Sequence, residues 1–280
     1  MIIWVASYPK SGNTWIRSVI SAYYYTSNGE FNFDLLKNIH QYPSRLYIKP
    51  QVNKPGEVSM LWELSQKEII NSNKNIFLKT HNANLYLDKN KFTSKKSTLG
   101  AIYVVRDPRN VISSLKNHYN LKNYDEALKF MTSDRKYIWD TRYKNDYSTF
   151  QFLSSWSNHY KSWKNTTDFK VFFVKYEDLE KDIVNTLNKL LKFINNLKND
   201  ISEIDKKKLD ACIKSTSFNL LKKKENQNGF PENVVDHQNK KIDFFHLGPK
   251  NNWEKLLSNK IKSKMSSILH EELKELKYIN

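Results

Sequence analysis

The chain of 280 residues is short of three features that each mark a special class of protein. Its single cysteine, Cys212, excludes an internal disulfide framework and makes a cysteine metal cluster implausible. With only 6 glycines and 7 prolines, it is neither collagen-like nor a Pro/Gly-rich disordered chain. No apolar run approaches the roughly 20 residues that cross a bilayer, and the apolar start, residues 1–7, lacks the basic leader of a signal peptide. These shortages predict a globular protein of a reducing, cytoplasmic compartment, with no membrane span.

What the chain has in excess is positive charge and aromatic residues. The formal net charge is +17, and 7 Trp, 16 Tyr and 15 Phe supply a sizeable core. The basic excess is spread along the chain and does not form a tail, which suits an anionic ligand. It also suits a nucleic-acid-binding module, or simply a composition biased toward Lys, Asn and Ile. Charge alone does not decide among these three interpretations.

The hydrophobic pattern predicts alternating strands and helices. Ile2–Ala6 is a continuous apolar run typical of a strand covered on both faces, and Thr14–Tyr25 has helical spacing. The same unit recurs as a strand at Gly100–Val105 and a helix at Asn110–Tyr119 that follows a proline. Further strands are expected at Ile76–Lys79 and Val171–Val174, further helices at Tyr124–Met131, Phe150–Lys164, Asp182–Leu197 and Lys260–Leu276, and polar segments at 26–75 and 225–250. We therefore expect one α/β domain over residues 1–280, with a central, mostly parallel sheet flanked by helices.

The turn after the first strand has the composition of an anion-binding loop. Residues 8–15 read YPKSGNTW, in which Gly12 permits a tight turn and the following helix directs its first amides outward. Lys10 adds a point charge, and the side chains of Ser11, Asn13 and Thr14 add donors. The order differs from the nucleoside-triphosphate P-loop, because the lysine precedes the glycine. An ordinary strand-to-helix turn is the alternative interpretation.

A second strand also delivers basic residues at its carboxyl end, where open α/β sheets bind ligands. Residues 103–114 read YVVRDPRNVISS, and Arg106 can hold a phosphate bidentately. Ser114 lies about two helical turns further on and is expected to meet the same anion. The alternative is that Arg106 only pairs with a neighbouring carboxylate such as Asp107.

A third strand end, residues 77–81 (FLKTH), presents Lys79 and His81 on the same face. A base beside a cation suits removal of a proton where negative charge develops. The alternative is a histidine with a packing role, and His118 and His159 are then the next candidates for the base.

Taken together, these three segments resemble the PAPS-dependent sulfotransferase family, especially its cytosolic branch (PAPS is 3′-phosphoadenosine-5′-phosphosulfate). Weaker matches follow in the family's order, at Trp156–Trp163, Tyr176–Leu179 and Thr216–Phe218. The resemblance covers about residues 2–255. It implies a P-loop-like α/β domain that transfers a sulfonate group from PAPS to a hydroxyl or amine and releases PAP, the desulfonated nucleotide.

The resemblance also implies a role for each matching residue. His81 would be the general base, Lys10 would stabilise the leaving phosphate oxygen, and Lys79 the sulfonate in transfer. The backbone of residues 11–14 (Ser11, Gly12, Asn13 and Thr14) would bind the 5′-phosphosulfate of the nucleotide, and Trp15 would lie beside the adenine. Arg106 and Ser114 would bind the 3′-phosphate. The nucleotide would also be lined by Tyr176, Thr216 and Phe218. No metal is expected, because cationic side chains and loop amides supply the charge.

Three departures from the family's pattern bear on these roles. Asn13 stands where the family usually has threonine or a small residue. His246-Leu247-Gly248 stands where the family often has Arg-Lys-Gly, which leaves Gly248 as the matching residue and Lys250 as the nearest candidate for a second contact with the 3′-phosphate. The short dimerisation signature of animal members is not found after Trp253, so the oligomeric state stays open.

The sequence leaves the acceptor unidentified. We expect a small molecule rather than a nucleic acid, bound by the segments 26–75 and 225–250, with Trp62, Tyr86 and Phe230 as candidate walls. The alternative enzyme is a nucleotide or small-molecule kinase, which shares a phosphate cradle but needs a Gly-Lys-Ser/Thr loop and carboxylates for Mg²⁺. The alternative without catalysis is the basic nucleic-acid-binding module.

Overall fold

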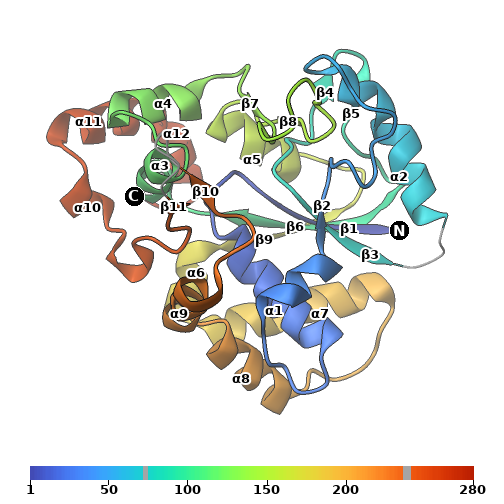
Figure 1. Ribbon diagram of the computed structural model, residues 1–280. Helices are drawn as coiled ribbons and strands as arrows, with labels where there is room; N and C mark the ends of the chain where they lie inside the picture. Colours follow the sequence, from blue (N-terminus) through green and yellow to red (C-terminus); the bar gives the residue numbers. More distant parts are fainter. Residues whose placement is uncertain (72–74, 236–240) are drawn as a thin grey trace.

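A parallel sheet lies at the centre of the molecule (Figure 1). The computed structural model describes residues 1–71, 75–235 and 241–280. Five strands pair in parallel in the order β2-β3-β1-β6-β9, with bounds His40–Gln41, Ile76–Thr80, Ile2–Ser7, Thr98–Val105 and Lys170–Lys175. The expected α/β architecture with a central parallel sheet is confirmed.

The central strand β1 explains how the sheet is covered. All six of its residues are buried, and alternate side chains point to opposite faces. Ile2, Trp4 and Ala6 join one hydrophobic cluster, while Ile3 and Val5 join another on the opposite face. Its first five residues, Ile2–Ala6, form an unbroken apolar run, as is typical of a sheet with helices on both sides.

Helices cover both faces of this sheet (Figure 1). The cluster around Ile3 and Val5 takes in α1 (Asn13–Tyr25), η1 (Phe33–Asn38), α6 (Tyr176–Lys181), α7 (Ile183–Lys198), α8 (Lys206–Ser215) and α9 (Phe218–Asn228). The cluster around Trp4 takes in η2 (Glu57–Leu61), α2 (Trp62–Ile70), α3 (Pro108–His118), α4 (Tyr124–Thr132), α5 (Trp156–Lys164), α11 (Asn259–Ile268) and α12 (His270–Glu275). The remaining elements are η3 (Gly248–Lys250), α10 (Trp253–Leu256) and the short pairs β4 (Tyr86–Leu87) with β5 (Asn90–Lys91), β7 (Tyr137–Ile138) with β8 (Gln151–Phe152), and β10 (Val234–Val235) with β11 (Lys241–Ile242).

Two helix predictions are wrong in part. The helix expected from Phe150 begins only at Trp156, because Gln151–Phe152 pairs as β8 and Ser155 caps the amide of Asn158. The single terminal helix expected over Lys260–Leu276 is two helices, which meet at Leu269. The polar segments 26–75 and 225–250 hold short elements such as η1, α2 and β10; their residues 72–74 and 236–240 lie outside the described part.

The parallel arrangement brings the carboxyl ends of β1, β3, β6 and β9 to one edge of the sheet. The loops that follow these ends carry the three segments singled out by the sequence, and ligands bind at such edges in open α/β sheets. Over the described ranges, no helix is both long enough and apolar enough to cross a membrane.

Candidate active site

The loop between β1 and α1 is shaped to present backbone amides. Gly12 precedes the helix with φ +103°, in the left-handed region that glycine adopts without strain. A Cβ at Gly12 would lie 2.6 Å from Cδ2 of Tyr176, so the backbone approaches that ring more closely than any side chain allows. Lys10 is also left-handed, with φ +67°. In the described part of the chain, the amides of Gly12, Asn13 and Thr14 have no acceptor, which leaves them available to an anion.

Not every polar side chain of this loop is available to bind an anion. Asn13 turns inward, and its Nδ2 donates to the Val5 carbonyl at 3.0 Å. The expectation that the Asn13 side chain adds a donor to the anion site is therefore wrong, although its amide remains available. Ser11 is fully buried, and its Oγ has no hydrogen-bond partner within residues 1–71, 75–235 and 241–280.

A cation cluster lies beside this loop. The Lys79 ammonium, at the end of β3, is 3.1 Å from Oε2 of Glu232, and Arg17 Nη1 on α1 is 2.5 Å from Oε1 of the same carboxylate. The Lys10 ammonium lies 3.5 Å from the centroid of the Phe244 ring. The loop, β3 and α1 thus bring three cations together around one carboxylate.

Burial and mutual repulsion tune these groups. Burial lowers the pKa of Lys10 to about 7, an effect that Glu232 opposes and that Lys79 reinforces. Burial also lowers the pKa of Lys79, against the attraction of Glu232. Burial alone would raise the pKa of Glu232, but Lys79 and Arg17 hold it well below its usual range, so this side chain is ionised.

His81 is held in one orientation by its ring and by its backbone. Its Nδ1 lies 2.8 Å from the Ser7 carbonyl, which can only accept, so Nδ1 carries the proton and Nε2 has the free lone pair. The amide of His81 donates to Gln151 Oε1 at 2.7 Å, and its carbonyl accepts from His159 Nε2 at 3.0 Å. This tautomer is the one that a general base requires.

Burial, together with the Lys79 ammonium, lowers the pKa of His81 well below 6.5. An unperturbed histidine titrates near pH 6.5. The ring of His81 instead stays neutral to much lower pH.

The two reserve candidates for the base, His159 and His118, make contacts of different kinds. Both nitrogens of His159 are occupied, since Nδ1 accepts from the Tyr103 hydroxyl at 2.8 Å and Nε2 donates to His81. His118 packs edge-on against Phe244, and burial with the neighbouring Lys10 lowers its pKa to about 2. His159 therefore positions His81.

Arg106, at the end of β6, contacts a tyrosine ring and no carboxylate oxygen among the described residues. Its guanidinium stacks 3.9 Å from the centroid of the Tyr176 ring, and among the described residues it makes no hydrogen bond or ion pair. Asp107 pairs instead with Arg109, at 2.6 Å, which removes the alternative that Arg106 is neutralised by Asp107. Trp15 meets the same tyrosine ring edge-on, 5.5 Å between centroids. A buried, unpaired guanidinium of this kind is a strong anion site.

The chain's C-terminal part braces this second site. Glu177 accepts from the Asp107 amide at 2.9 Å and from the Tyr278 hydroxyl at 2.9 Å, while Arg109 donates to the Tyr278 carbonyl. Ser114 Oγ accepts from Asn251 Nδ2 at 3.1 Å, so its own proton is left for another acceptor.

The remaining sequence-predicted residues, Phe218, Gly248, Thr216 and Lys250, differ in burial and in the contacts that they make. Phe218 packs against Gly248, where a Cβ would lie 2.4 Å from the phenyl ring. Thr216 is fully buried, and its hydroxyl donates to the Cys212 carbonyl at 2.7 Å, so its proton is not available to a ligand. Lys250 is exposed, on η3 next to Gly248.

The candidate acceptor walls do not form one surface. Trp62 is fully buried in the core beside Phe92, and Tyr86 is 62% exposed. Phe230 is buried against Phe244, and the Lys10 ammonium packs over the Phe244 ring. Only Phe230 is thus linked to the cation cluster, through Phe244.

Sequence reasoning missed two residues of the site outright. Glu232 belongs to a weakly periodic polar segment, and no motif marks it. Gln151, which holds the His81 amide, stood in a segment interpreted as helix. His159 was part of a quoted motif, but only the structure shows what it holds.

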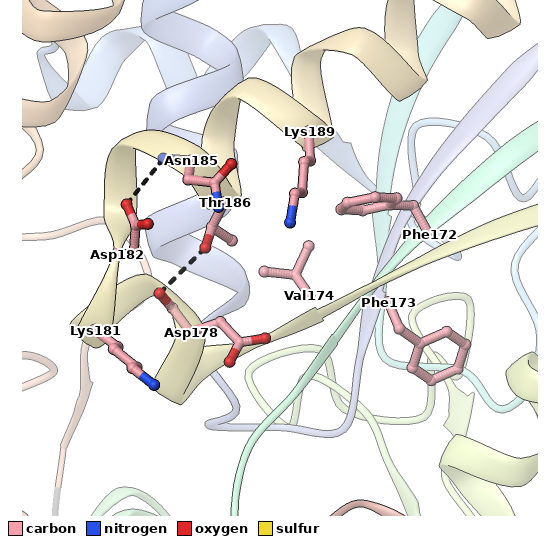
Figure 2. Close-up of a pocket in the computed structure, with 9 residues that line it drawn as sticks. All are labelled: Phe172, Phe173, Val174, Asp178, Lys181, Asp182, Asn185, Thr186 and Lys189. Atoms are coloured by element: carbon pink, nitrogen blue, oxygen red, sulfur yellow. Dashed lines mark hydrogen bonds between the residues drawn. The ribbon is translucent and has the colours of Figure 1, made fainter.

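A hollow with a different lining lies between the edge strand β9 and the helices α6 and α7. Figure 2 shows its lining, with Phe172 and Val174 on one side and the α7 side chains on the other. Its volume is about 370 Å³. Asp182 accepts from the Asn185 amide and Thr186 donates to the Asp178 carbonyl, so these groups serve the helix turn. None of the sequence-predicted site residues lines this hollow.

Comparison with known proteins gives a consistent picture. A family model described as "Sulfotransferase domain" matches residues 2–277. An amine sulfotransferase of Oryctolagus cuniculus is 22% identical over 284 residues, covering 99% of this chain and 83% of that protein. Sulfotransferase 1B1 of Canis lupus familiaris is 26% identical over 281 residues, covering 96% and 82%.

Solved structures with the same fold are more distant in sequence. Mouse sulfotransferase SULT7A1 complexed with PAP superposes with a TM-score of 0.57 at 20% identity, covering 97% of this chain and 84% of that one. Retinol dehydratase in complex with androsterone and inactive cofactor PAP gives a TM-score of 0.57 at 15% identity, covering 98% and 80%.

Proposed function

The chain belongs to the sulfotransferase family, and from that membership we propose that it transfers a sulfonate group from PAPS to a hydroxyl or amine of a small-molecule acceptor, releasing PAP. The observation that carries the proposal is the pair of anion sites at neighbouring strand ends. One comprises Lys10, Lys79 and the loop amides; the other is the unpaired guanidinium of Arg106. A nucleotide with phosphate groups at both its 3′ and 5′ positions matches two such sites.

The residues present fit that nucleotide. Arg106 has a buried Nε without a partner in the described part of the chain, and Ser114 has a hydroxyl proton to donate, so these two would bind the 3′-phosphate. The amides of Gly12, Asn13 and Thr14 would bind the 5′-phosphosulfate, whereas the Ser11 amide already donates to the Tyr8 carbonyl. Trp15, Tyr176 and Phe218 would flank the adenosine, with Gly12 and Gly248 keeping the backbone close to those rings. Thr216 would shape this wall from behind.

His81 and the two lysines would perform the transfer. His81 Nε2 takes the acceptor proton as the acceptor atom bonds to sulfur and the bond from sulfur to the bridging phosphate oxygen breaks. Lys10 stabilises the negative charge that develops on that oxygen, and Lys79 stabilises the sulfonate oxygens. Because these cations compensate the charge, the mechanism requires no metal ion.

The proposal extends to the setting of the reaction. We assign residues 1–280 to one sulfotransferase domain that acts in the cytoplasm, where its single buried cysteine stays reduced.

Thermal unfolding with added nucleotide tests this function. PAP at 100 times its dissociation constant should stabilise the protein by about 2.7 kcal/mol. ATP with Mg²⁺ at the same concentration should give little shift, because ATP has no 3′-phosphate for Arg106. Equal stabilisation by PAP and ATP–Mg²⁺ would count against the assignment. A screen of phenols, sugars, sterols and amines with labelled PAPS then identifies the acceptor class.

A further inference from the structure

Glu232 places a negative charge inside the cation cluster that the reaction needs. It lies between α9 and β10, and its two carboxylate oxygens contact different cations, Arg17 at 2.5 Å and Lys79 at 3.1 Å. Its side chain is 27% exposed, against 4% for Arg17 and 9% for Lys79. Among the described residues, it is the one carboxylate paired with Lys79.

The pairing with Lys79 is the part of this arrangement that bears on the proposed reaction. Arg17 is buried, with one further bond to the Ile39 carbonyl, so it requires an anionic partner. One carboxylate oxygen satisfies that requirement. The other oxygen reaches the ammonium of Lys79, which under the proposed function holds the sulfonate during transfer.

Two anions cannot both make close contact with one ammonium without repelling each other. Glu232 remains ionised in this cluster, so the repulsion cannot be relieved by protonation near neutral pH. When a sulfonate approaches Lys79, the carboxylate must give up that contact, and Arg17 is placed to retain it through the other oxygen. The product PAP has no sulfonate and does not require the exchange.

We propose that Glu232 is a selectivity residue that takes the sulfonate's place on Lys79 in the ligand-free protein, and so weakens binding of PAPS relative to PAP. The inference rests on the proposed function. It concerns only the ratio of the two affinities, so the test separates its failure from that of the function itself.

The test is calorimetric titration of Glu232→Gln with PAPS and with PAP, without acceptor. Glutamine keeps an oxygen for Arg17 but removes the negative charge. The dissociation constant for PAPS should fall about tenfold, since a charge-assisted contact no longer has to be exchanged. That for PAP should stay within about twofold, because PAP brings no sulfonate to Lys79. An unchanged or weaker affinity for PAPS relative to PAP would overturn the inference.

Two further variants complete the experiment. Glu63→Gln makes the same change of net charge in an exposed pair with Lys96, and should leave both affinities unchanged. If Glu232→Gln does not fold, Glu232→Asp replaces it: the shorter side chain cannot span Arg17 and Lys79, and PAPS should again gain relative to PAP. An unchanged ratio in Glu232→Asp would overturn the inference. If the wild-type protein binds neither nucleotide, the proposed function fails, whatever Glu232 does.

Discussion

The two anion sites of this protein are built in opposite ways. At the end of β6, Arg106 stacks on Tyr176 and, among the described residues, forms no ion pair, while Asp107, Glu177 and Tyr278 are bonded to one another or to their neighbours. At the ends of β1 and β3, Lys79 is paired with Glu232, and burial leaves Lys10 with a pKa of about 7. The first site is charged and open before any ligand arrives. The positive charge of the second site is partly neutralised by Glu232 and by the lowered pKa of Lys10. Under this account, an anionic ligand restores that charge when it binds.

The contrast suits the different tasks of the two sites. Binding that is equal in the ground and transition states lowers KM without raising kcat. A fixed guanidinium on a non-reacting phosphate supplies binding of that kind. The cations and the base around the reacting group must instead respond to charge that moves during transfer. Lys10, Lys79 and His81 suit this task, because their pKa values are shifted by burial and by their neighbours.

The largest expected effect lies at the reacting site. His81→Asn should lower kcat by about 10²–10⁴-fold, because a positioned general base contributes that much. Binding of PAP should persist, since the base does not hold the nucleotide. Single-turnover transfer of labelled sulfonate, with PAP affinity measured in parallel, checks both statements.

His118→Asn is the matched control, because His118 is a second buried histidine beside Lys10 and Phe244. It should retain most of the turnover. Near-normal transfer by folded, PAP-binding His81→Asn protein would show that the base lies elsewhere.

The next effect separates the two sites by kinetic parameter. Arg106→Ala should raise KM for PAPS by about 10- to 150-fold, the equivalent of the roughly 1.5–3 kcal/mol of a hydrogen bond to a charged group. Its kcat should change little, because the contact is the same in the ground and transition states. Arg142→Ala removes an exposed arginine paired with Asp140 and should leave both parameters unchanged. A normal KM with a collapsed kcat would mean that Arg106 acts on the reacting group.

The third effect is a pH dependence that only the reacting site should have. The pKa of Lys10 in the free protein is lowered to about 7, so Lys10 is mostly neutral above that pH and must take up a proton to bind an anion. Affinity for PAPS should therefore be greatest below pH 7 and fall by up to about tenfold per pH unit above it. Calorimetry from pH 7 to 9 in buffers of different ionisation enthalpy measures this uptake, and Lys10→Met should abolish it. A flat profile in the wild-type protein would contradict the lowered pKa.

The dependence of kcat on acidic pH tests the lowered pKa of His81. Burial and Lys79 lower the pKa of His81 well below 6.5, so the neutral ring is available at pH 6 and the rate should not yet have fallen there. An inflection in kcat near pH 6.5 that disappears in His81→Asn would show an unperturbed histidine.

The smallest effect is expected beside Arg106, where Glu177 joins the Asp107 amide to the Tyr278 hydroxyl. Tyr278→Phe removes the hydroxyl that donates to Glu177 and should weaken PAP binding about threefold, as expected when one hydrogen bond of about 0.5–1.5 kcal/mol is lost. As a positioning residue, Tyr278 should affect KM and leave kcat unchanged. Tyr143→Phe, at a half-exposed ring away from these hydrogen bonds, is the control. A fall in kcat with unchanged KM would place Tyr278 in another role.

Much of this molecule could be predicted from sequence where pattern and physics agree. The strands β1, β3, β6 and β9 each contain a continuous apolar run, and each motif follows such a run, so the fold and the edge where the motifs gather follow from periodicity. The roles of Lys10, His81 and Arg106 came from short motifs whose order matches the family, and they remain proposals for activity assays to test.

What could not be predicted depends on contacts between segments far apart in the chain. Glu232 reaches Lys79 and Arg17 across more than a hundred residues of sequence, and nothing local marks it. The inward turn of Asn13 toward Val5 and the loss of the Thr216 hydroxyl to Cys212 depend on packing. The pKa of His81 depends on burial and on Lys79, which its own segment reveals only in part.

The central claim is that two separate sites hold one nucleotide, and a thermodynamic cycle on Arg106 tests it most directly. PAP and 5′-AMP, which differ by the 3′-phosphate, are titrated calorimetrically into the wild-type protein and into Arg106→Ala. The account predicts that loss of the 3′-phosphate weakens binding to the wild-type protein by about 10- to 150-fold and changes binding to the variant far less. The same loss of affinity in both proteins would show that Arg106 does not hold the 3′-phosphate, and would contradict the account.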